Sequence, residues 1–508
     1  MLDQLDELKT SFGPKQAKRV ESLLGRLSRH KFREPDSLVR YHELLLFVRA
    51  YPHSAAIMRA AEKELSGFAK RVEWLRDQGV DTGVLEHPDV SGIVGTTVTD
   101  TFSFYIVRWL MQRYPAQTRI FWDWFEDDAR LAATWPRFMP LLTEDAYVEA
   151  NVPYRQWLNA ARNGRPELAW LIEGFDKLPM PEEGKAELYD SQNLYVQWSP
   201  PLRATRTGLR IPPRKPFYHD GPLIQRREID LNQELAQPAP PLRKLSKKDG
   251  EKVLDRAREA STTRYRELYG FTHGDPRHVY QIEVGRGVEF FLMGLPPEKR
   301  LPLRAYHALM IYKNGVPVGY FETLTLFEHM ETGFNLYYTF RDGETAWLYA
   351  RILNVMHHFT GATAFSLDPY QIGFENEEGI ASGAFWFYRK LGFRPTHREL
   401  LTLAEKEERK IATRKQYRTP PKTLRELAKG RMLFQIAGTE NHDWDRFQVR
   451  NIGFRRQRKS DEPLISDPHL IRAKSAPEET TYLKLMQKDR QLRRKLLKLG
   501  STIRDSIF

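Results

Sequence analysis

The sequence predicts a mixed α/β protein, with a central mixed sheet flanked by helices over residues 246–400, a mostly α-helical domain before it and a basic helical extension after it. Three observations predict this class. Apolar segments of strand and helix length alternate between residues 305 and 395, apolar residues recur at helical spacing before residue 190, and positive charge concentrates after residue 400. A chain of 508 residues has room for two to four domains.

Residues 1–195 are expected to form the helical domain. The apolar runs Leu44–Val48, Phe102–Met111 and Leu168–Phe175 lie among further apolar residues at intervals of three and four. Eight of the 11 tryptophans lie between residues 74 and 198, and each ring can remove on the order of 150–250 Å² from water. This composition indicates a folded domain, and no motif in it indicates a function.

Residues 196–245 are expected to connect two domains. Prolines crowd this stretch at Pro200, Pro201, Pro212, Pro213, Pro216, Pro222, Pro238, Pro240 and Pro241. Proline fixes φ and cannot donate to a strand ladder, so the stretch is interpreted as an extended connector with short strands at most.

Residues 246–400 begin with a helical segment, Lys247–Tyr269, and continue with a hairpin. Ala305–Lys313 is an apolar strand, Asn314-Gly315 suits a two-residue turn, and Val316–Phe327 returns as the partner strand. Gly287–Met293 is a candidate for an additional strand.

The next elements are predicted from composition and spacing. After a break at His329–Gly333, the aromatic segment Phe334–Phe340 is expected to be a strand. Apolar residues then recur at helical spacing from Glu344 to a stop at Gly361. Ala362–Leu367 is a short strand, and a helix carrying Tyr388 ends at Gly392, before an extended segment.

This order of elements, closed by Phe387-Tyr-Arg-Lys-Leu-Gly-Phe393, resembles the GNAT N-acetyltransferase superfamily over about residues 246–400. The resemblance implies a GNAT-like sheet and an acyl-CoA, such as acetyl-CoA, bound in a gap between the fourth and fifth strands. Those strands would be Phe334–Phe340 and Ala362–Leu367. The diphosphate would rest on backbone N–H groups at the start of the intervening helix, where the helix dipole favours an anion.

The resemblance also implies which residues hold the cofactor. The cofactor-binding candidates are Tyr338, Thr339, Phe340, Arg341, Asp342, Gly343, Glu344, Thr345 and Ala346. In the family's loop pattern, Arg341 and Ala346 fit, whereas Glu344 stands where the first glycine is usual. A carboxylate there suits the helix dipole but would repel a diphosphate. Ala381 stands where the family often has asparagine.

The predicted activity is acyl-CoA-dependent N-acyl transfer to a small-molecule or peptide amine. Such a reaction needs an acid for the leaving sulfur, a donor for the thioester oxygen and a group that accepts the ammonium proton. By resemblance, Tyr388 is the acid, and a backbone N–H of the fourth strand, at Tyr338 or Thr339, is the donor. Glu322, in a strand facing the acceptor, is the candidate base, with His307 and Asp368 as further candidates.

Composition bears on the cellular compartment and on the kinds of site that the chain can form. The chain has no cysteine, which excludes disulfides, thiolate metal sites and cysteine nucleophiles and favours a reducing cytoplasm. The N-terminus lacks the features of a signal peptide, and no apolar run approaches the roughly 20 residues of a membrane span. His357 and His358 are adjacent and do not share a helix face, so no metal is expected.

Residues 401–508 form a basic extension, with 26 Lys and Arg against 14 Asp and Glu, a net of +12 out of +13 for the chain. The apolar residues Tyr482, Leu485, Met486, Leu492, Leu496 and Leu499 are expected to share one face of a helix ending at Gly500, with basic residues around them. Two interpretations follow: the helix binds nucleic acid or an anionic surface, or it docks by its apolar face on the protein itself. A third hypothesis for the whole chain is a non-catalytic GNAT-fold binding or scaffold protein, which Glu344 favours.

Overall fold

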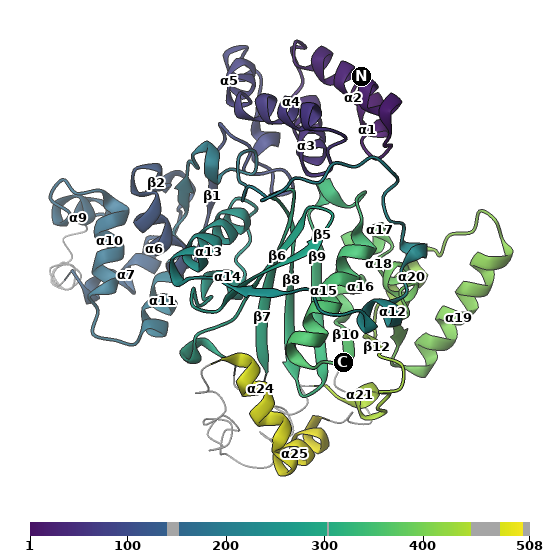
Figure 1. The fold of residues 1–508 in the computed structure, drawn as a ribbon. Coiled ribbons are helices and arrows are strands. Elements are labelled where there is room, and N and C mark those ends of the chain that lie inside the picture. The colour runs from purple at the N-terminus through teal and green to yellow at the C-terminus, as the bar shows by residue number, and fades with distance from the viewer. Residues whose placement is uncertain (140–151, 302–303, 449–477, 501–508) are drawn as a thin grey trace. The chain divides into compact units, whose positions relative to one another are not determined.

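The computed structural model describes residues 1–139, 152–301, 304–448 and 478–500, and these fall into two compact units (Figure 1). The first unit contains Met1–Lys9, Pro14–Ile211 and Leu254–Leu268. The second contains Thr10–Gly13, Pro212–Val253 and the described residues from Tyr269 onward.

The first unit is mostly helical, which confirms the prediction for the N-terminal region. Its helices are α1 (Leu2–Leu8), α2 (Pro14–Leu27), α3 (Pro35–Ala50), α4 (Ala55–Ser66), α5 (Ala69–Asp77), α6 (Phe104–Arg113), α7 (Asp128–Ala132), α9 (Tyr154–Ala161), α10 (Glu167–Asp176) and α11 (Glu182–Asp190), joined by the second part of α13 (Lys247–Thr262). A small antiparallel sheet of order β1-β3-β2 joins Val98–Asp100, Val196–Trp198 and Thr118–Ile120.

Aromatic side chains fill the core of this unit, as the tryptophan count predicts. Trp135 and Trp198 are fully buried, and Trp109 packs edge to face against Trp198 with ring centroids 6.2 Å apart. The segment Leu254–Leu268 belongs to this core region because its polar groups pair there: Asp255 accepts from Trp109 Nε1 at 2.9 Å, and Glu259 accepts from the hydroxyl of Tyr114.

The second unit is built on a nine-stranded mixed sheet of order β11-β12-β10-β9-β8-β7-β6-β5-β4 (Figure 1). Its strands are β4 (Leu242–Lys244), β5 (Val279–Gly285), β6 (Val288–Met293), β7 (Ala305–Lys313), β8 (Val316–Leu326), β9 (His329–Leu336), β10 (Ala364–Leu367), β11 (Arg394–Pro395) and β12 (Met432–Gln435). Every neighbouring pair is antiparallel except β9 and β10, which are parallel.

The hairpin of β7 and β8 is confirmed, with the turn at Asn314-Gly315. Both turn residues have positive φ, 48° and 77°, as a two-residue turn that follows the twist of the strands requires. The additional strand at Gly287–Met293 is also confirmed as β6, and β5 precedes it.

The predicted break at His329–Gly333 is wrong, because these residues are the first part of β9. The chain instead turns at Phe327 and Glu328, with Phe327 at φ 55°, and Leu326 pairs with His329. The predicted strand Phe334–Phe340 is correct only as far as Leu336. Residues Tyr338–Phe340 form the 3-10 turn η8.

The helix predicted from Glu344 is α15 (Thr345–Thr360), and it ends at Gly361 with φ 78°. Three short helices follow β10: α16 (Pro369–Ile372), α17 (Glu377–Ser382) and α18 (Ala384–Arg389). The last carries Tyr388 and ends at Arg389, three residues before the predicted stop, and Gly392 at φ 102° lies in the turn that follows. β9, α15 and β10 thus form one parallel strand-helix-strand unit.

Part of the predicted basic extension belongs to the sheet. The helices α19 (Arg398–Thr413) and α20 (Pro421–Leu427) lead into β12, which lies between β10 and β11. The short helix α21 (Asp443–Arg446) follows. The sequence did not predict β12, since a short apolar run cannot be told from a buried helix segment by periodicity alone.

The terminal helices α24 (Glu479–Lys488) and α25 (Arg490–Gly500) dock on the second unit. Leu483, Met486, Leu492 and Leu496 are buried in one cluster with Trp444, Phe327 and the first residues of β7 and β10. Arg493 pairs with Glu328, with Nη1 2.6 Å from Oε2. The docked arrangement is therefore confirmed, with two helices in place of the one predicted.

Candidate functional site

The parallel strands β9 and β10 differ in length, and β9 continues past the point where β10 ends, which we call the separation. They pair over four residues, ending at Thr332 opposite Leu367, and β9 then continues to Leu336 while β10 stops. Beyond this point the backbone N–H of Phe334 donates to the side chain of Gln371 in α16, at 3.3 Å. A side chain thus takes the place of a strand partner, and the separation leaves a gap in the hydrogen-bond ladder.

Tyr349, from α15, is the central side chain on one face of this gap. Its hydroxyl lies 3.1 Å from Oγ1 of Thr332, the last paired residue of β9, and Thr332 donates in turn to the carbonyl of Ser366 at 3.2 Å. The Tyr349 ring lies 5.1 Å from that of Phe334 and 5.5 Å from that of Tyr388, centroid to centroid. The predicted acid therefore lies next to a residue that touches the point of separation.

Tyr388 has the properties that a proton donor at neutral pH needs. Its side chain is buried, and burial raises the pKa of its hydroxyl well above the ordinary value, so the group stays protonated. Among the described residues, no hydrogen-bond partner faces this hydroxyl, whereas that of Tyr349 is bonded to Thr332. Tyr388 thus keeps its proton for another acceptor.

Glu322 lies on the opposite face of the sheet. It pairs with Gly333 in the register of β8 and β9, and Gly333 stands between Thr332 and Phe334, whose side chains lie on the α15 face. The hydroxyl of Tyr306, in β7, donates to the Glu322 carboxylate and also accepts from the backbone N–H of Gly270 at 3.2 Å. Burial raises the pKa of Glu322 above the ordinary carboxyl value.

The separation therefore has a proton donor on one side and a carboxyl group of raised pKa on the other. The sequence singled out Tyr388 and Glu322, but not their partners Tyr349, Tyr306 and Gln371. Of these three, only Tyr306 could have been found from the sequence. Ala308 is the strand partner of Glu322, and Tyr306, two positions before Ala308, lies on the same face of the hairpin as Glu322.

Glu344, the unusual residue of the predicted phosphate loop, is buried at 1% exposure and is paired. Its Oε1 lies 2.5 Å from Nη2 of Arg286, and its Oε2 lies 3.5 Å from Nζ of Lys313. Oε1 also accepts from the backbone N–H of Ile224 at 3.1 Å. The carboxylate is thus neutralised by two cations.

The same cluster anchors the proline-rich connector. Phe217 exchanges two hydrogen bonds with the side chain of Asn314, at 2.8 and 2.9 Å, and its ring lies 5.0 Å from the guanidinium of Arg286. Lys313 is fully buried, and burial lowers its pKa to about 7. Glu344 therefore fastens the connector to the start of α15, a structural role that the sequence did not reveal.

The predicted cofactor-binding residues divide into two groups. Tyr338, Thr339 and Phe340 lie in the 3-10 turn η8 and not in a strand, so the expectation that Tyr338 or Thr339 offers a strand N–H is wrong. The cause is the early end of β9, where Arg341 Nε donates to the carbonyl of Leu336 at 3.3 Å.

The second group starts α15. Arg341 pairs with Glu378 at 2.6 Å, Thr345 Oγ1 donates to the carbonyl of Arg341 at 3.0 Å, and Asp342 is exposed. Gly343 donates its N–H to Phe340, and Ala346 is buried. These residues lie at the start of α15, which connects β9 and β10.

Three basic side chains of the second unit lie near one another: Lys390, which follows α18, Arg226 in the 3-10 turn η6 (Arg226–Glu228) and Arg418. Burial lowers the pKa of Lys390, and the charges of Arg226 and Arg418 lower it further. Lys390 forms no ion pair with a described carboxylate. Mutually repelling cations favour the binding of an anion.

The two further base candidates lie elsewhere. His307 is buried in β7 beside Glu479, 3.8 Å away, and burial lowers its pKa to about 3. Asp368 caps α16 by accepting from the N–H of Tyr370 at 2.9 Å. Neither is brought to Glu322.

No family model, curated protein or solved structure matches this chain. Within the described ranges no group of three or more metal-ligating side chains occurs, and none of the helices there combines the length and apolar character of a membrane span.

Proposed function

We propose that the chain is an acyl-CoA-dependent N-acyltransferase, with a GNAT-like fold in its second unit. The observation that carries this proposal is the separation of the parallel strands β9 and β10 around α15, with Tyr388 and Glu322 on its two faces. The resemblance of Phe387–Phe393 to the closing motif of that superfamily supports the same assignment.

Each group has a defined task in this reaction. The bound acyl-CoA supplies a thioester. Glu322 accepts a proton from the acceptor ammonium, so that the neutral amine attacks the thioester carbon. The backbone N–H of Phe334 releases the side chain of Gln371 and donates instead to the thioester oxygen, whose developing negative charge it stabilises. As the carbon–sulfur bond breaks, Tyr388 donates its proton to the sulfur and takes up the second proton that the attacking nitrogen must lose, and the products are an amide and CoA.

The burial and pairing of Glu344 weaken the argument that its carboxylate repels the CoA diphosphate and that the protein is therefore non-catalytic. A solvent-facing carboxylate at the start of α15 would repel a diphosphate, but this one is buried between Arg286 and Lys313. The group of Lys390, Arg226 and Arg418 offers positive charge for the phosphates of CoA. A scaffold role remains an outcome that the experiment below distinguishes.

The proposal is tested by calorimetric titration of the full chain with acetyl-CoA, followed by a thiol-release assay with a panel of small amines and peptides. Because the protein has no cysteine, every thiol detected in the assay comes from CoA. We expect micromolar binding and release that depends on the amine. Binding without release from any acceptor would favour the scaffold hypothesis, and no binding would contradict both.

Gly333 offers a matched pair of variants for this test. A Cβ on Gly333 would meet only Gln371 Nε2 at 3.7 Å and the carbonyl of Glu322 at 3.9 Å, which are ordinary contacts. Gly333→Ala should therefore retain acetyl-CoA binding, whereas the ring of Gly333→Phe should fill the separation and abolish it. Equal binding by both variants would place the ligand elsewhere.

A second candidate function rests on the basic surface of the terminal helices, which we define as Lys484, Lys488, Arg490 and Arg494. These side chains are exposed although the helices are docked. Binding of nucleic acid through them should weaken steeply with salt, because counterion release dominates such affinity. Binding that is insensitive to salt, or unchanged when all four residues are replaced by glutamine, would exclude this function.

A further inference from the structure

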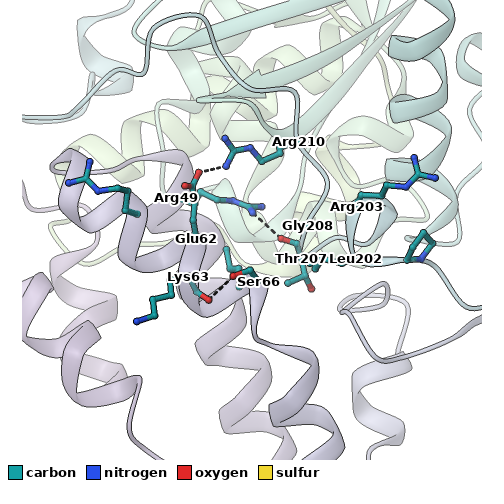
Figure 2. A pocket seen from close by; sticks show the side chains of 12 residues that line it. Arg49, Glu62, Lys63, Ser66, Leu202, Arg203, Thr207, Gly208 and Arg210 are labelled. Atoms are coloured by element: carbon teal, nitrogen blue, oxygen red, sulfur yellow. Dashed lines mark hydrogen bonds and ion pairs between the residues drawn. The ribbon is translucent and has the colours of Figure 1, made fainter.

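A cavity in the first unit, separate from the site above, is lined mainly by cations. It lies between α3, α4 and the chain segment Pro201–Arg210, and its volume is about 750 Å³ (Figure 2). We call it the arginine cavity. The residues that line it are Arg49, Arg59, Glu62, Lys63, Leu65, Ser66, Pro201, Leu202, Arg203, Thr207, Gly208 and Arg210. The volume falls in the range of small-molecule sites, about 300–1,000 Å³.

The charges around this cavity do not balance. Arg49, Arg59, Lys63, Arg203 and Arg210 contribute five positive charges, and Glu62 contributes the one negative charge of the lining. Glu62 is already engaged, since its carboxylate forms an ion pair with Arg210 (Figure 2). The lining residues therefore leave an excess of four positive charges around a single concave space, which favours an anion.

Arg49 is the most unusual of these cations because it is 3% exposed. Its Nη1 donates to the carbonyl of Thr207 at 2.9 Å, whereas its Nε and Nη2 are buried with no hydrogen-bond partner among the described residues. Burial lowers its pKa to about 10, so the group is still charged at neutral pH. A buried charge with unused donors is costly unless something pairs with it.

Another buried arginine of the same unit shows the contrast. Arg206 is 4% exposed, and its Nη2 lies 2.5 Å from Oε2 of Glu43. A carboxylate therefore pairs with a neighbouring buried guanidinium, whereas none from the described part of the chain is in direct contact with Arg49. A structural role for Arg49 would be expected to come with such a partner.

We propose that the arginine cavity binds a small phosphorylated molecule, with its phosphate held by Arg49 and Arg210. A phosphate carries up to two negative charges and accepts hydrogen bonds from guanidinium groups in a bidentate manner, which suits unused donors on Arg49. The cavity is larger than a phosphate ion, and Leu65, Pro201 and Leu202 supply apolar lining for an organic part. This site is independent of the proposed acyltransferase site.

The test measures thermal stability and calorimetric binding of the full chain with inorganic phosphate, pyrophosphate and glucose 6-phosphate, at constant ionic strength in chloride. We expect a rise in Tm of roughly 2–5 °C at saturation, because a ligand that binds only the folded chain stabilises it. The rise should persist in Gly333→Phe, which separates it from diphosphate binding at the acyl-CoA site. No rise with any of the three compounds would overturn the proposal.

Three variants locate the effect. Arg49→Met and Arg210→Gln should each lose most of the rise, whereas Arg33→Gln removes one exposed charge outside the cavity and should retain it. Arg49→Met should also leave the Tm without ligand unchanged or higher, since it removes an unpaired buried charge. If Arg49→Met does not fold, the comparison of Arg210→Gln with Arg33→Gln decides. A rise that all variants retain would overturn the proposal, as would binding of a 12-nucleotide single strand without binding of the small phosphates.

Discussion

Glu344 Oε1 lies 2.5 Å from Nη2 of Arg286, and this ion pair fixes the N-cap residue of α15 to the turn between β5 and β6. Glu344→Gln would leave Arg286 and Lys313 without their counter-charge. We expect the free energy of unfolding to fall by about 3 kcal/mol, as when one partner of a buried pair is removed. Urea unfolding followed by tryptophan fluorescence measures this loss.

The control for this variant is Glu378→Gln, which breaks the exposed pair with Arg341. Its effect should stay within about 1 kcal/mol. If Glu344→Gln kept full stability and gained affinity for acetyl-CoA, the carboxylate would face the ligand, contrary to the structure.

Tyr388→Phe tests the proton donor. The hydroxyl has no partner among the described residues, so its removal should cost little stability, while the rate of CoA release should fall by about 10²- to 10⁴-fold. Binding of acetyl-CoA should not change. The matched control is Tyr370→Phe, at an exposed tyrosine of α16, which should retain full activity. An undiminished rate in Tyr388→Phe would show that another group protonates the sulfur.

Glu322 predicts a pH dependence of the reaction. The group acts as a base only after losing its proton, and burial raises its pKa. The value of kcat/KM should therefore rise with pH through a midpoint above the ordinary carboxyl range. Glu322→Gln should remove this rise of kcat/KM at acidic pH, the acidic limb of the profile, together with most of the activity. Tyr306→Phe should shift the pH of the acidic limb and preserve turnover. A limb that survives in Glu322→Gln would exclude Glu322 as the base.

Glu479 makes the docking of the terminal helices depend on pH. Burial raises the pKa of this carboxyl from 4.5 to about 7, although its oxygens accept from the N–H groups of Leu295 and Tyr306. Between pH 4.5 and about pH 7, Glu479 is protonated in the folded chain and ionised in the unfolded chain. The resulting stability is present below pH 4.5 and is lost as pH rises through 7, by about 3 kcal/mol at most.

The measurement compares the wild type with Glu479→Gln at pH 5.5 and pH 8 by thermal unfolding. Both proteins contain His307, whose low pKa keeps it neutral at both pH values, so its own contribution cancels. The stability difference in favour of the variant should grow toward pH 8. Glu478→Gln should lower stability slightly and by the same amount at both pH values, because Lys244 lowers the pKa of Glu478 from 4.5 and the carboxyl is ionised in both the folded and the unfolded chain at pH 5.5 and pH 8. Equal differences at both pH values would contradict the prediction.

Elements fixed by short-range chemistry could be predicted from the sequence. Asn314-Gly315 and Gly361 take positive φ at the positions where a turn and a helix end were expected, and Gly392 takes positive φ in the turn after the helix that carries Tyr388. Gly333 misled the prediction because glycine usually interrupts a strand, whereas here pairing with Glu322 across the sheet holds it in β9.

Relationships between distant parts of the chain could not be predicted. The partners of Glu344 come from the turn after β5, the end of β7 and the connector, and no local pattern joins these segments. The hydrogen bond from Tyr306 to Glu322 depends on strand register in the same way. Similarly, Arg49 follows the apolar run Leu44–Val48 and gives no sign in the sequence that its charge is buried.

The path of the chain between the two units has a practical consequence. Residues Leu254–Leu268 complete the first unit, whereas Pro212–Val253 and the residues after Tyr269 build the second, and α13 supplies residues to both. A single cut in the gene would therefore leave one fragment without Asp255 and Glu259, the partners of Trp109 and Tyr114. No single truncation point therefore isolates either unit, because the segments of the two units alternate along the chain.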